Sequence, residues 1–290
     1  MNTNSIAVVY ALLKKIVFHT KGVYTSLVYI IATVILTMAL SSCSKNADKL
    51  KEAVPVVEVG DQKIIDYLVS SYGFAKSDIE IKNEGFLVEG DIFFPKQDFW
   101  KNYTLNSNDT ETGKHYRTAS LVTKVSTIKV CFSSNVPSAW KSAYRKAFEA
   151  WNSLNGKLKF VETSTSWPMY GIQIQYAYLG WNNPLAETYP PVGGAPGSSS
   201  IINASLNISL SYNLNQKTWT AVHELGHAIG FGHTDYRQYS NETLISTANV
   251  GCNTYSDPSS VMRRFIPTSN SPWSTFSTCD KAAYKKLYPK

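Results

Sequence analysis

One stretch of the chain, which reads His-Glu-Leu-Gly-His-Ala-Ile-Gly-Phe-Gly-His from His223 onward, constrains the fold more than any other. His223 and His227 lie four residues apart, so on a helix both imidazoles face one side and can reach a single metal ion. Gly230 lets the chain leave the helix in a conformation that a Cβ disfavours, which brings His233 back as a third ligand. Three imidazoles leave a fourth position open for water, the arrangement of a catalytic zinc site. We therefore predict one catalytic Zn²⁺, with Glu224 as the base that takes a proton from its water.

A second element lies downstream, where residues 256–262 read Ser-Asp-Pro-Ser-Ser-Val-Met. A tight turn that ends in methionine, placed after the third histidine, resembles the methionine turn of the metzincin metallopeptidases. The resemblance implies that Met262 forms an apolar floor beneath the metal without binding it. Astacins and serralysins carry a tyrosine two residues after this methionine, whereas this chain has Arg264. A tyrosine that acts at the metal is therefore not expected here.

The stretch from His223 to Asp235 also resembles the bacterial dual-action HEIGH metallopeptidases, with Leu225 where the family name has isoleucine. The resemblance covers most of the chain beyond about residue 66 and is strongest from Ile128 to Pro289. It implies an α+β fold: a metzincin-like catalytic domain with a twisted mixed sheet and two long helices above a mostly irregular C-terminal lobe that ends in a helix. The residues that it assigns are the zinc ligands His223, His227 and His233 and the general base Glu224. Asp235 is expected to orient one of the ligand histidines by binding the ring nitrogen that does not face the metal.

The formal charge of +7 invites a nucleic-acid interpretation. However, the first 43 residues hold three of the 28 basic residues and no acid, so 25 basic residues against 21 acidic ones leave +4 for the rest of the chain. No basic run or alternation of basic and aromatic residues is present, which argues against a nucleic-acid partner. The low charged fraction of 17% and the aromatic fraction of 13% favour a folded exported protein over a disordered one.

The N-terminus has the pattern of a targeting segment. Basic residues precede an uncharged apolar run from Val23 to Leu40, which is followed by small residues and Cys43. This pattern predicts a signal peptide over residues 1–42. The ending resembles a bacterial lipobox, which implies that Cys43 is acylated and anchors the exported protein to a membrane of the bacterial envelope, on its periplasmic face or at the cell surface. The alternative is an N-terminal transmembrane anchor, because the run is just long enough to cross a bilayer.

Export permits disulfide bonds, and three cysteines remain after Cys43. Cys252 and Cys279 bracket the methionine turn, and we predict that they pair. Cys131 lies in an apolar strand and is expected to pack as a small hydrophobic residue.

Residues 43–120 form a propeptide-like or accessory segment that ends in a linker. A helix is expected over 62–72 and a strand over 85–94, followed by a stretch rich in Asn, Thr and Asp over 101–112. The run Phe86-Leu87-Val88-Glu89-Gly90-Asp91-Ile92 resembles the astacin propeptide motif, in which an aspartate after glycine occupies the zinc. The resemblance implies that Asp91 holds the enzyme latent until cleavage within 101–120. The alternative is an acidic turn residue in a small accessory domain. No cysteine lies between residues 44 and 130, which excludes a cysteine switch.

Residues 121–290 read as the zinc peptidase domain. A helix capped by Ser138 is predicted, with one apolar stripe at steps of three and four residues. Strands are expected over 127–132, 158–161, 171–179 and 201–210, the metal-binding helix from about Gln216, and a closing helix over 274–288. By analogy with the clan, the 201–210 strand is an edge that binds the substrate backbone; the alternative is an ordinary sheet edge.

These features together predict a zinc-dependent endopeptidase that acts on a peptide or protein substrate. Two other classes stay open: a metal-bearing lipoprotein that binds a surface ligand without cleaving it, and a non-proteolytic zinc hydrolase or a protein toxin of the metzincin type. The intact Glu224 argues against a pure binding module, which needs no base. The 236–255 segment is expected to wall the specificity pocket, and the sequence yields no prediction about cleavage specificity, calcium sites or oligomeric state.

Overall fold

The computed structural model describes residues 59–72, 74–97, 99–100, 115–118, 120–181, 184–205, 212–235, 243–245, 257–264 and 274–290. The chain divides into two compact units, Met1–Pro55 and Val56–Lys290, and all described residues belong to the second. The predicted signal peptide, Cys43, Cys252, the 101–112 stretch and most of the 236–255 segment lie outside the described residues. None of the helices in the described part has the length and hydropathy of a membrane span.

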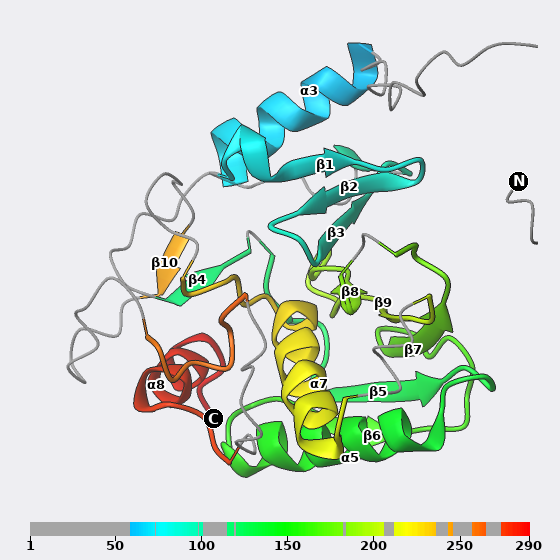
Figure 1. Cartoon of the computed structure of the whole chain (residues 1–290). Helices are drawn as coiled ribbons and strands as arrows, with labels where there is room; N and C mark the ends of the chain where they lie inside the picture. Colours follow the sequence, from blue (N-terminus) through cyan, green and yellow to red (C-terminus); the bar gives the residue numbers. More distant parts are fainter. Residues whose placement is uncertain are drawn as a thin grey trace, which may run out of the picture. The chain divides into compact units, whose positions relative to one another are not determined.

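The described strands form an eight-stranded mixed sheet and a separate two-stranded sheet (Figure 1). The larger sheet has the strand order β1-β2-β3-β8-β9-β7-β5-β6. In chain order its strands are β1 (Ile79–Ile81), β2 (Gly85–Val88), β3 (Ile92–Pro95), β5 (Thr127–Phe132), β6 (Lys159–Glu162), β7 (Ile172–Ala177), β8 (Ala186–Thr188) and β9 (Ser199–Asn203). The smaller sheet pairs β4 (His115–Arg117) with β10 (Thr243–Ile245).

The order of the strands corrects the predicted substrate-binding edge. Strand β9 is paired with β7 on one side and with β8 on the other, so the described part of the predicted 201–210 strand is interior to the sheet. Strand β8 runs antiparallel to β9, and on its other side it is joined in parallel by β3 through the pair Ile92 and Thr188. Without the β1-β2-β3 part of the sheet, the edge would be β8.

Two long helices, α5 (Ser138–Ser153) and α7 (Leu214–Ala228), pack against each other and contribute to the main hydrophobic core (Figure 1). The predicted apolar stripe of α5 is buried, as expected; its members are Trp140, Ala143, Tyr144, Ala147, Phe148 and Trp151. The predicted cap of α5 was wrong, because Pro137 is the N-cap and Ser138 is the first helical residue without a capping bond. Helix α7 begins with a capping box between Asn213 and Gln216, in which each side chain accepts the other's backbone N–H.

The segment before the linker has a hydrophobic core of its own. Helix α3 (Val59–Tyr67) continues into a π-helical turn, η1 (Leu68–Tyr72), and a 3₁₀ turn, η2 (Lys76–Asp78), precedes β1. The buried side chains of this second core are Ile64, Ile65, Leu68, Tyr72, Phe74, Phe86, Val88, Ile92, Phe94 and Phe99. The predicted helix and strand of this segment are thus both present, and the strand run is a β2–β3 hairpin.

The C-terminal part ends in helix α8 (Thr278–Leu287), which is capped by Ser277 rather than beginning at residue 274. The α+β class, the mixed sheet, the two long helices and the final helix are as predicted. Cys131 is free and buried, as expected. Cys279 is disulfide-bonded, and its pairing with Cys252 stays a prediction because Cys252 lies outside the described residues.

Candidate metal centre

Helix α7 carries the first two histidines of the motif, and the loop after it carries the third. His223 and His227 lie one helical turn apart, and their Nε2 atoms approach to 2.9 Å. The helix ends at Ala228, and Gly230 has a φ of 101°, a conformation that favours glycine and lets the chain turn back. His233 returns with its Nε2 3.2 Å from that of His223. The three imidazoles predicted to converge therefore do so, and all three are buried.

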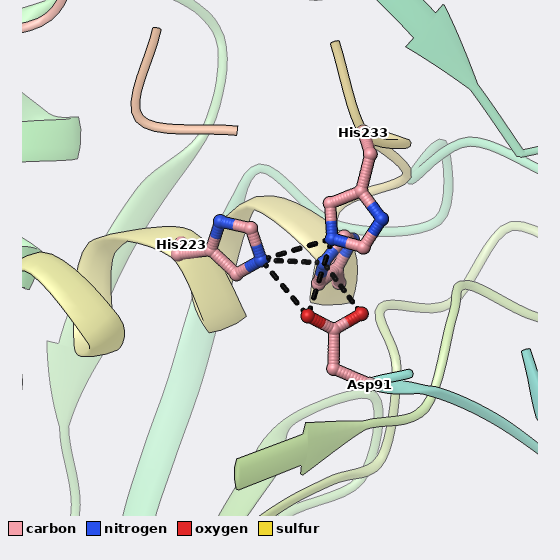
Figure 2. Close-up of side chains that lie close together, drawn as sticks. Asp91, His223 and His233 are labelled. Carbon is pink, nitrogen blue, oxygen red and sulfur yellow. Dashed lines mark hydrogen bonds and ion pairs between the residues drawn. The ribbon is translucent and has the colours of Figure 1, made fainter. Parts of the chain in front are cut away.

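The fourth group at the centre is Asp91, from the turn between β2 and β3 (Figure 2). Its Oδ2 lies 3.2 Å from Nε2 of both His223 and His233, and its Oδ1 lies 3.4 Å from Nε2 of His227. The backbone continues the contact, because Thr188 N donates to Asp91 O at 2.8 Å. The hairpin thus places one carboxylate among three imidazoles and pairs its backbone with strand β8.

The spacing of these donor atoms fits a single tetrahedral ion. Metal bonds of about 2.0–2.2 Å from N and O ligands place neighbouring donors of a tetrahedron roughly 3.3–3.6 Å apart. The donor atoms of Asp91, His223, His227 and His233 all lie within 4.8 Å of one another, with several separations between 2.9 and 3.4 Å. Asp91 Oδ1 is buried without a hydrogen-bond partner among the described residues, and a cation between the rings would compensate it by coordination. Three nitrogens and one carboxylate oxygen are a donor set that suits zinc.

The second ring nitrogen of each histidine is bonded to an oxygen atom, which directs the lone pair of Nε2 toward the centre. His223 Nδ1 donates to Val261 O and His227 Nδ1 to Phe231 O, each at 2.8 Å. His233 Nδ1 lies 3.0 Å from Glu89 Oε2. Glu89 therefore holds the role that Asp235 was predicted to have.

Asp235 was wrongly predicted as a histidine partner, because its carboxylate contacts the two residues that follow Met262. Its Oδ1 accepts from Arg264 N at 3.0 Å, and its Oδ2 lies 3.4 Å from Arg263 Nε. Asp235 therefore ties the loop after the third histidine to the residues that follow Met262, and its effect on the metal centre is indirect.

Met262 is buried against α7, the helix that carries two of the histidines. A Cβ at Gly226 would come within 2.3 Å of the Met262 sulfur, so the helix presents a glycine where the methionine packs. The turn is held by Asp280 of α8, which accepts from Ser260 Oγ at 2.6 Å and from Val261 N at 3.0 Å. Since Val261 O is the acceptor for His223, Asp280 positions that ligand through the turn.

Glu224 is buried beside the histidines, and one of its oxygens is bound by a hydroxyl. Thr188 Oγ1 donates to Glu224 Oε2 at 2.6 Å. Ser200 Oγ lies 2.8 Å from Thr188 Oγ1 and 2.8 Å from the hydroxyl of Tyr144, which extends the contact into a buried chain of hydroxyls. The chain fixes the orientation of the carboxylate, because all of its members are buried and their positions are set by β8, β9 and α5.

Burial and close ionic contacts shift the pKa values at the centre. Burial raises the pKa of Glu224 well above its usual range, with the Asp91 carboxylate adding to the rise, and burial lowers the pKa of His227 to about 4. Burial also opposes the charged forms of Asp91 and His233, but the groups around each of them together outweigh it. Attraction to His233 and His227, with hydrogen bonds from His223 and His227, holds the pKa of Asp91 well below its usual range. Attraction to and hydrogen bonds with Asp91 and Glu89 hold the pKa of His233 well above its usual range. The pocket therefore favours a positive charge among its carboxylates.

Comparison with known families agrees with this geometry. The family described as "Dual-action HEIGH metallo-peptidase" matches residues 87–288, which is most of the chain. The chain belongs to this family. The members of this family are metallopeptidases, so the substrate of this chain is a peptide or protein and its site is that of a metal-dependent hydrolase. The match begins within β2 and thus includes the hairpin that carries Asp91.

Solved structures also match, among them one described as "Structure of Myroilysin". That chain is 15% identical, with 58% of this chain and 82% of that chain covered and a TM-score of 0.38. A search of curated proteins gave no match.

Several residues that build the site have no signal in the local sequence. Glu89 and Thr188 reach the centre from segments far from the histidine motif, and neither stands in a spacing that indicates metal chemistry. Asp280 does have a signal, since Ser277 and Asp280 form a capping box, but that pattern predicts only a helix start. Trp219, which stacks on the His223 ring at 5.1 Å between centroids, lies one turn before that histidine and is found only by helical spacing.

Proposed function

We propose that this protein is a zinc-dependent endopeptidase whose intact chain is held latent by Asp91. The observation that carries the proposal is the approach of three imidazole Nε2 atoms and one carboxylate to the separations of a tetrahedral site. Membership of a metallopeptidase family supports hydrolysis of peptide bonds as the reaction. His223, His227, His233 and Asp91 would hold the ion in the intact chain.

Zinc, when bound, would supply Lewis acidity that acidifies water and polarises the scissile carbonyl. The protein's own contribution is a base in a fixed position. Glu224 accepts the proton of the attacking water and delivers it to the leaving amine, so one carboxylate serves both halves of the reaction. Thr188 holds one oxygen of this carboxylate, which leaves the other to exchange the proton. The three histidines are oriented with Nε2 toward the ion by the oxygen atoms that are hydrogen-bonded to their Nδ1 atoms.

Substrate binding is proposed along the edge of β8. A peptide in extended conformation adds to a sheet edge through backbone hydrogen bonds. In the intact chain β3 occupies this edge, with Thr188 N bonded to Asp91 O. Because Thr188 also donates a hydrogen bond to Glu224, the position of the base is fixed relative to the backbone of the edge strand.

The same contacts support the proposed latency. Asp91 takes the position that a reacting water needs, and β3 takes the edge that a substrate needs. The separate hydrophobic core of the N-terminal segment supports its treatment as a discrete propeptide-like unit within 43–120 that is released after cleavage in the 101–120 stretch. The catalytic part would then comprise residues 121–290.

The proposed location is the bacterial envelope, with the exported chain anchored by lipid on Cys43 at the periplasmic face or cell surface. The basic residues, the apolar run and the small residues before Cys43 support this. Metabolic labelling with a fatty-acid analogue should mark the wild-type protein and leave Cys43→Ala unlabelled. Absence of label from both proteins, with both retained in the membrane fraction, would favour the transmembrane alternative.

The catalytic proposal is tested with a chain in which a site-specific protease sequence replaces part of the 104–112 stretch. After cleavage, peptide-library hydrolysis should appear, stop with a chelator and return with zinc. Glu224→Gln in the same background should bind one zinc ion and lose hydrolysis by several orders of magnitude. Zinc binding without any peptide hydrolysis after cleavage would favour a binding protein instead. Equal rates before and after cleavage would refute latency alone.

A further inference from the structure

The third histidine differs from the other two in the origin of the oxygen that binds its Nδ1. His223 and His227 use backbone carbonyls of Val261 and Phe231, which belong to the catalytic part of the chain. His233 uses the side chain of Glu89, which lies 3.0 Å away on the β2–β3 hairpin. Both side chains are fully buried, so this contact is shielded from water.

The backbone conformation at Glu89 is unfavourable for a glutamate. Glu89 and Gly90 are the central residues of a turn closed by a bond from Asp91 N to Val88 O, and their φ angles are 52° and 97°. A turn with two positive φ angles favours Asn-Gly, because a glutamate in the left-handed region is less stable than an asparagine or glycine. The chain nevertheless has glutamate at this position, and the bond from Glu89 N to Asp78 O at 2.9 Å helps to hold it. Strain of this kind is typical of functional positions.

We propose that Glu89 is a positioning residue of the metal centre, acting through His233. The hairpin then has two tasks: Asp91 occupies the centre, and Glu89 fixes the tautomer and the ring direction of the third ligand. The N-terminal segment is consequently part of the metal site in the intact chain, and it makes metal binding tighter as well as blocking the reaction. Release of the segment removes one donor atom and also the acceptor of His233. This inference rests on the proposed metal centre and adds a second role for the segment.

The test uses the full-length chain and its affinity for zinc. Glu89→Asn creates the Asn-Gly pair that the turn favours, so the hairpin is retained while the shorter side chain no longer reaches His233. Glu89→Gln keeps the length and one acceptor oxygen, and its effect is expected to lie between those of wild type and Glu89→Asn. Glu84→Gln is the matched control, since Glu84 is an exposed glutamate at the other end of β2.

Zinc dissociation constants are measured by competition with a chromophoric chelator. Loss of a ligand's hydrogen-bond acceptor typically weakens metal binding by about 10–100-fold, and this is the change expected for Glu89→Asn. The melting temperature of the metal-free Glu89→Asn chain should equal or exceed that of wild type, which separates positioning from a general loss of stability. In ¹H–¹⁵N spectra of the zinc-loaded chain, the His233 Nδ1–H should exchange faster with water in this variant.

The outcomes separate this inference from the proposed function. Zinc affinity of Glu89→Asn within about twofold of wild type, with Glu89→Gln also unchanged, overturns the inference alone. Absence of zinc binding by the wild-type chain overturns the proposed function as well. If Glu89→Asn does not fold, Glu89→Gln carries the test, and a zinc affinity equal to that of Glu84→Gln contradicts the positioning role.

Discussion

Asp280 is expected to control both the stability of the methionine turn and the orientation of a metal ligand. Its carboxylate is buried and accepts from Ser260 Oγ, from Val261 N and from Ser277 N. Asp280→Ala leaves the buried Val261 N–H without a partner and removes half of the capping box of α8. Asp280→Asn keeps one oxygen for the two backbone N–H groups, and its amide can donate to Ser260.

The magnitudes follow from these partners. An orphaned buried N–H costs about 1–3 kcal/mol, and loss of a capping interaction costs about 1 kcal/mol. We therefore expect Asp280→Ala to lower the free energy of unfolding by about 3 kcal/mol and Asp280→Asn to lower it by about 1–2 kcal/mol. Because Val261 O is the acceptor for His223, zinc affinity should also fall, by roughly tenfold for Asp280→Ala.

The assay is urea unfolding of the metal-free full-length chain, followed by chelator competition for zinc. Asp257→Asn is the control, because Asp257 lies on the same turn and also binds Ser277, but its side chain is only half-buried. It should cost less than about 1 kcal/mol and leave zinc affinity unchanged. An effect of Asp280→Ala no larger than that of Asp257→Asn would refute the reasoning.

Three further predictions concern the surroundings of the site. Thr188→Val removes the donor to Glu224 in an isosteric side chain and should lower kcat of the cleaved enzyme by roughly 10–100-fold, whereas Thr188→Ser should restore most of it; equal rates for the two variants would contradict the role of the hydroxyl. Burial raises the pKa of Glu187 from 4.5 to about 7, so the folded state holds this proton more tightly than the unfolded state does. The protonated carboxyl therefore stabilises the fold fully below pH 4.5, and this contribution is lost as the pH rises to about 7. Glu187→Gln should therefore be more stable than wild type at pH 8, by up to about 3 kcal/mol, and parallel pH profiles of denaturation for the two chains would disprove this. Gly226→Ala forces Met262 to move and should cost about 1–3 kcal/mol in thermal and urea unfolding, and the double variant with Met262→Ala should lose less than the sum of the single changes.

The parts of the site that were predictable are those determined by local chain geometry. Two histidines and a glutamate on one helix, a glycine at the helix end and a returning histidine need only helical spacing and the φ preference of Gly230. The apolar stripe of α5 follows from the same periodicity. Asp91 reaches the histidines although 132 residues separate it from His223, and it was predicted only through the resemblance of its turn to a known motif.

The parts that were missed depend on contacts between distant segments. Strand β8 has only three residues and follows an irregular stretch, so no alternation in the sequence indicates it, and the longer apolar run from residue 201 was taken as the edge instead. Glu89 was not assigned to His233 because Asp235 is nearer in sequence, whereas the hairpin brings Glu89 nearer in space. Propensity and spacing carry no information about such pairings, which are set by sheet order and by the packing of one core against another.

The most direct test of the metal centre is anomalous diffraction at the zinc edge from crystals of the intact chain grown with zinc. We predict one strong peak within about 2.0–2.2 Å of Nε2 of His223, His227 and His233, with the Asp91 carboxylate as the fourth ligand. A peak bound by other residues, or histidine rings that point away from a common position, would contradict the account.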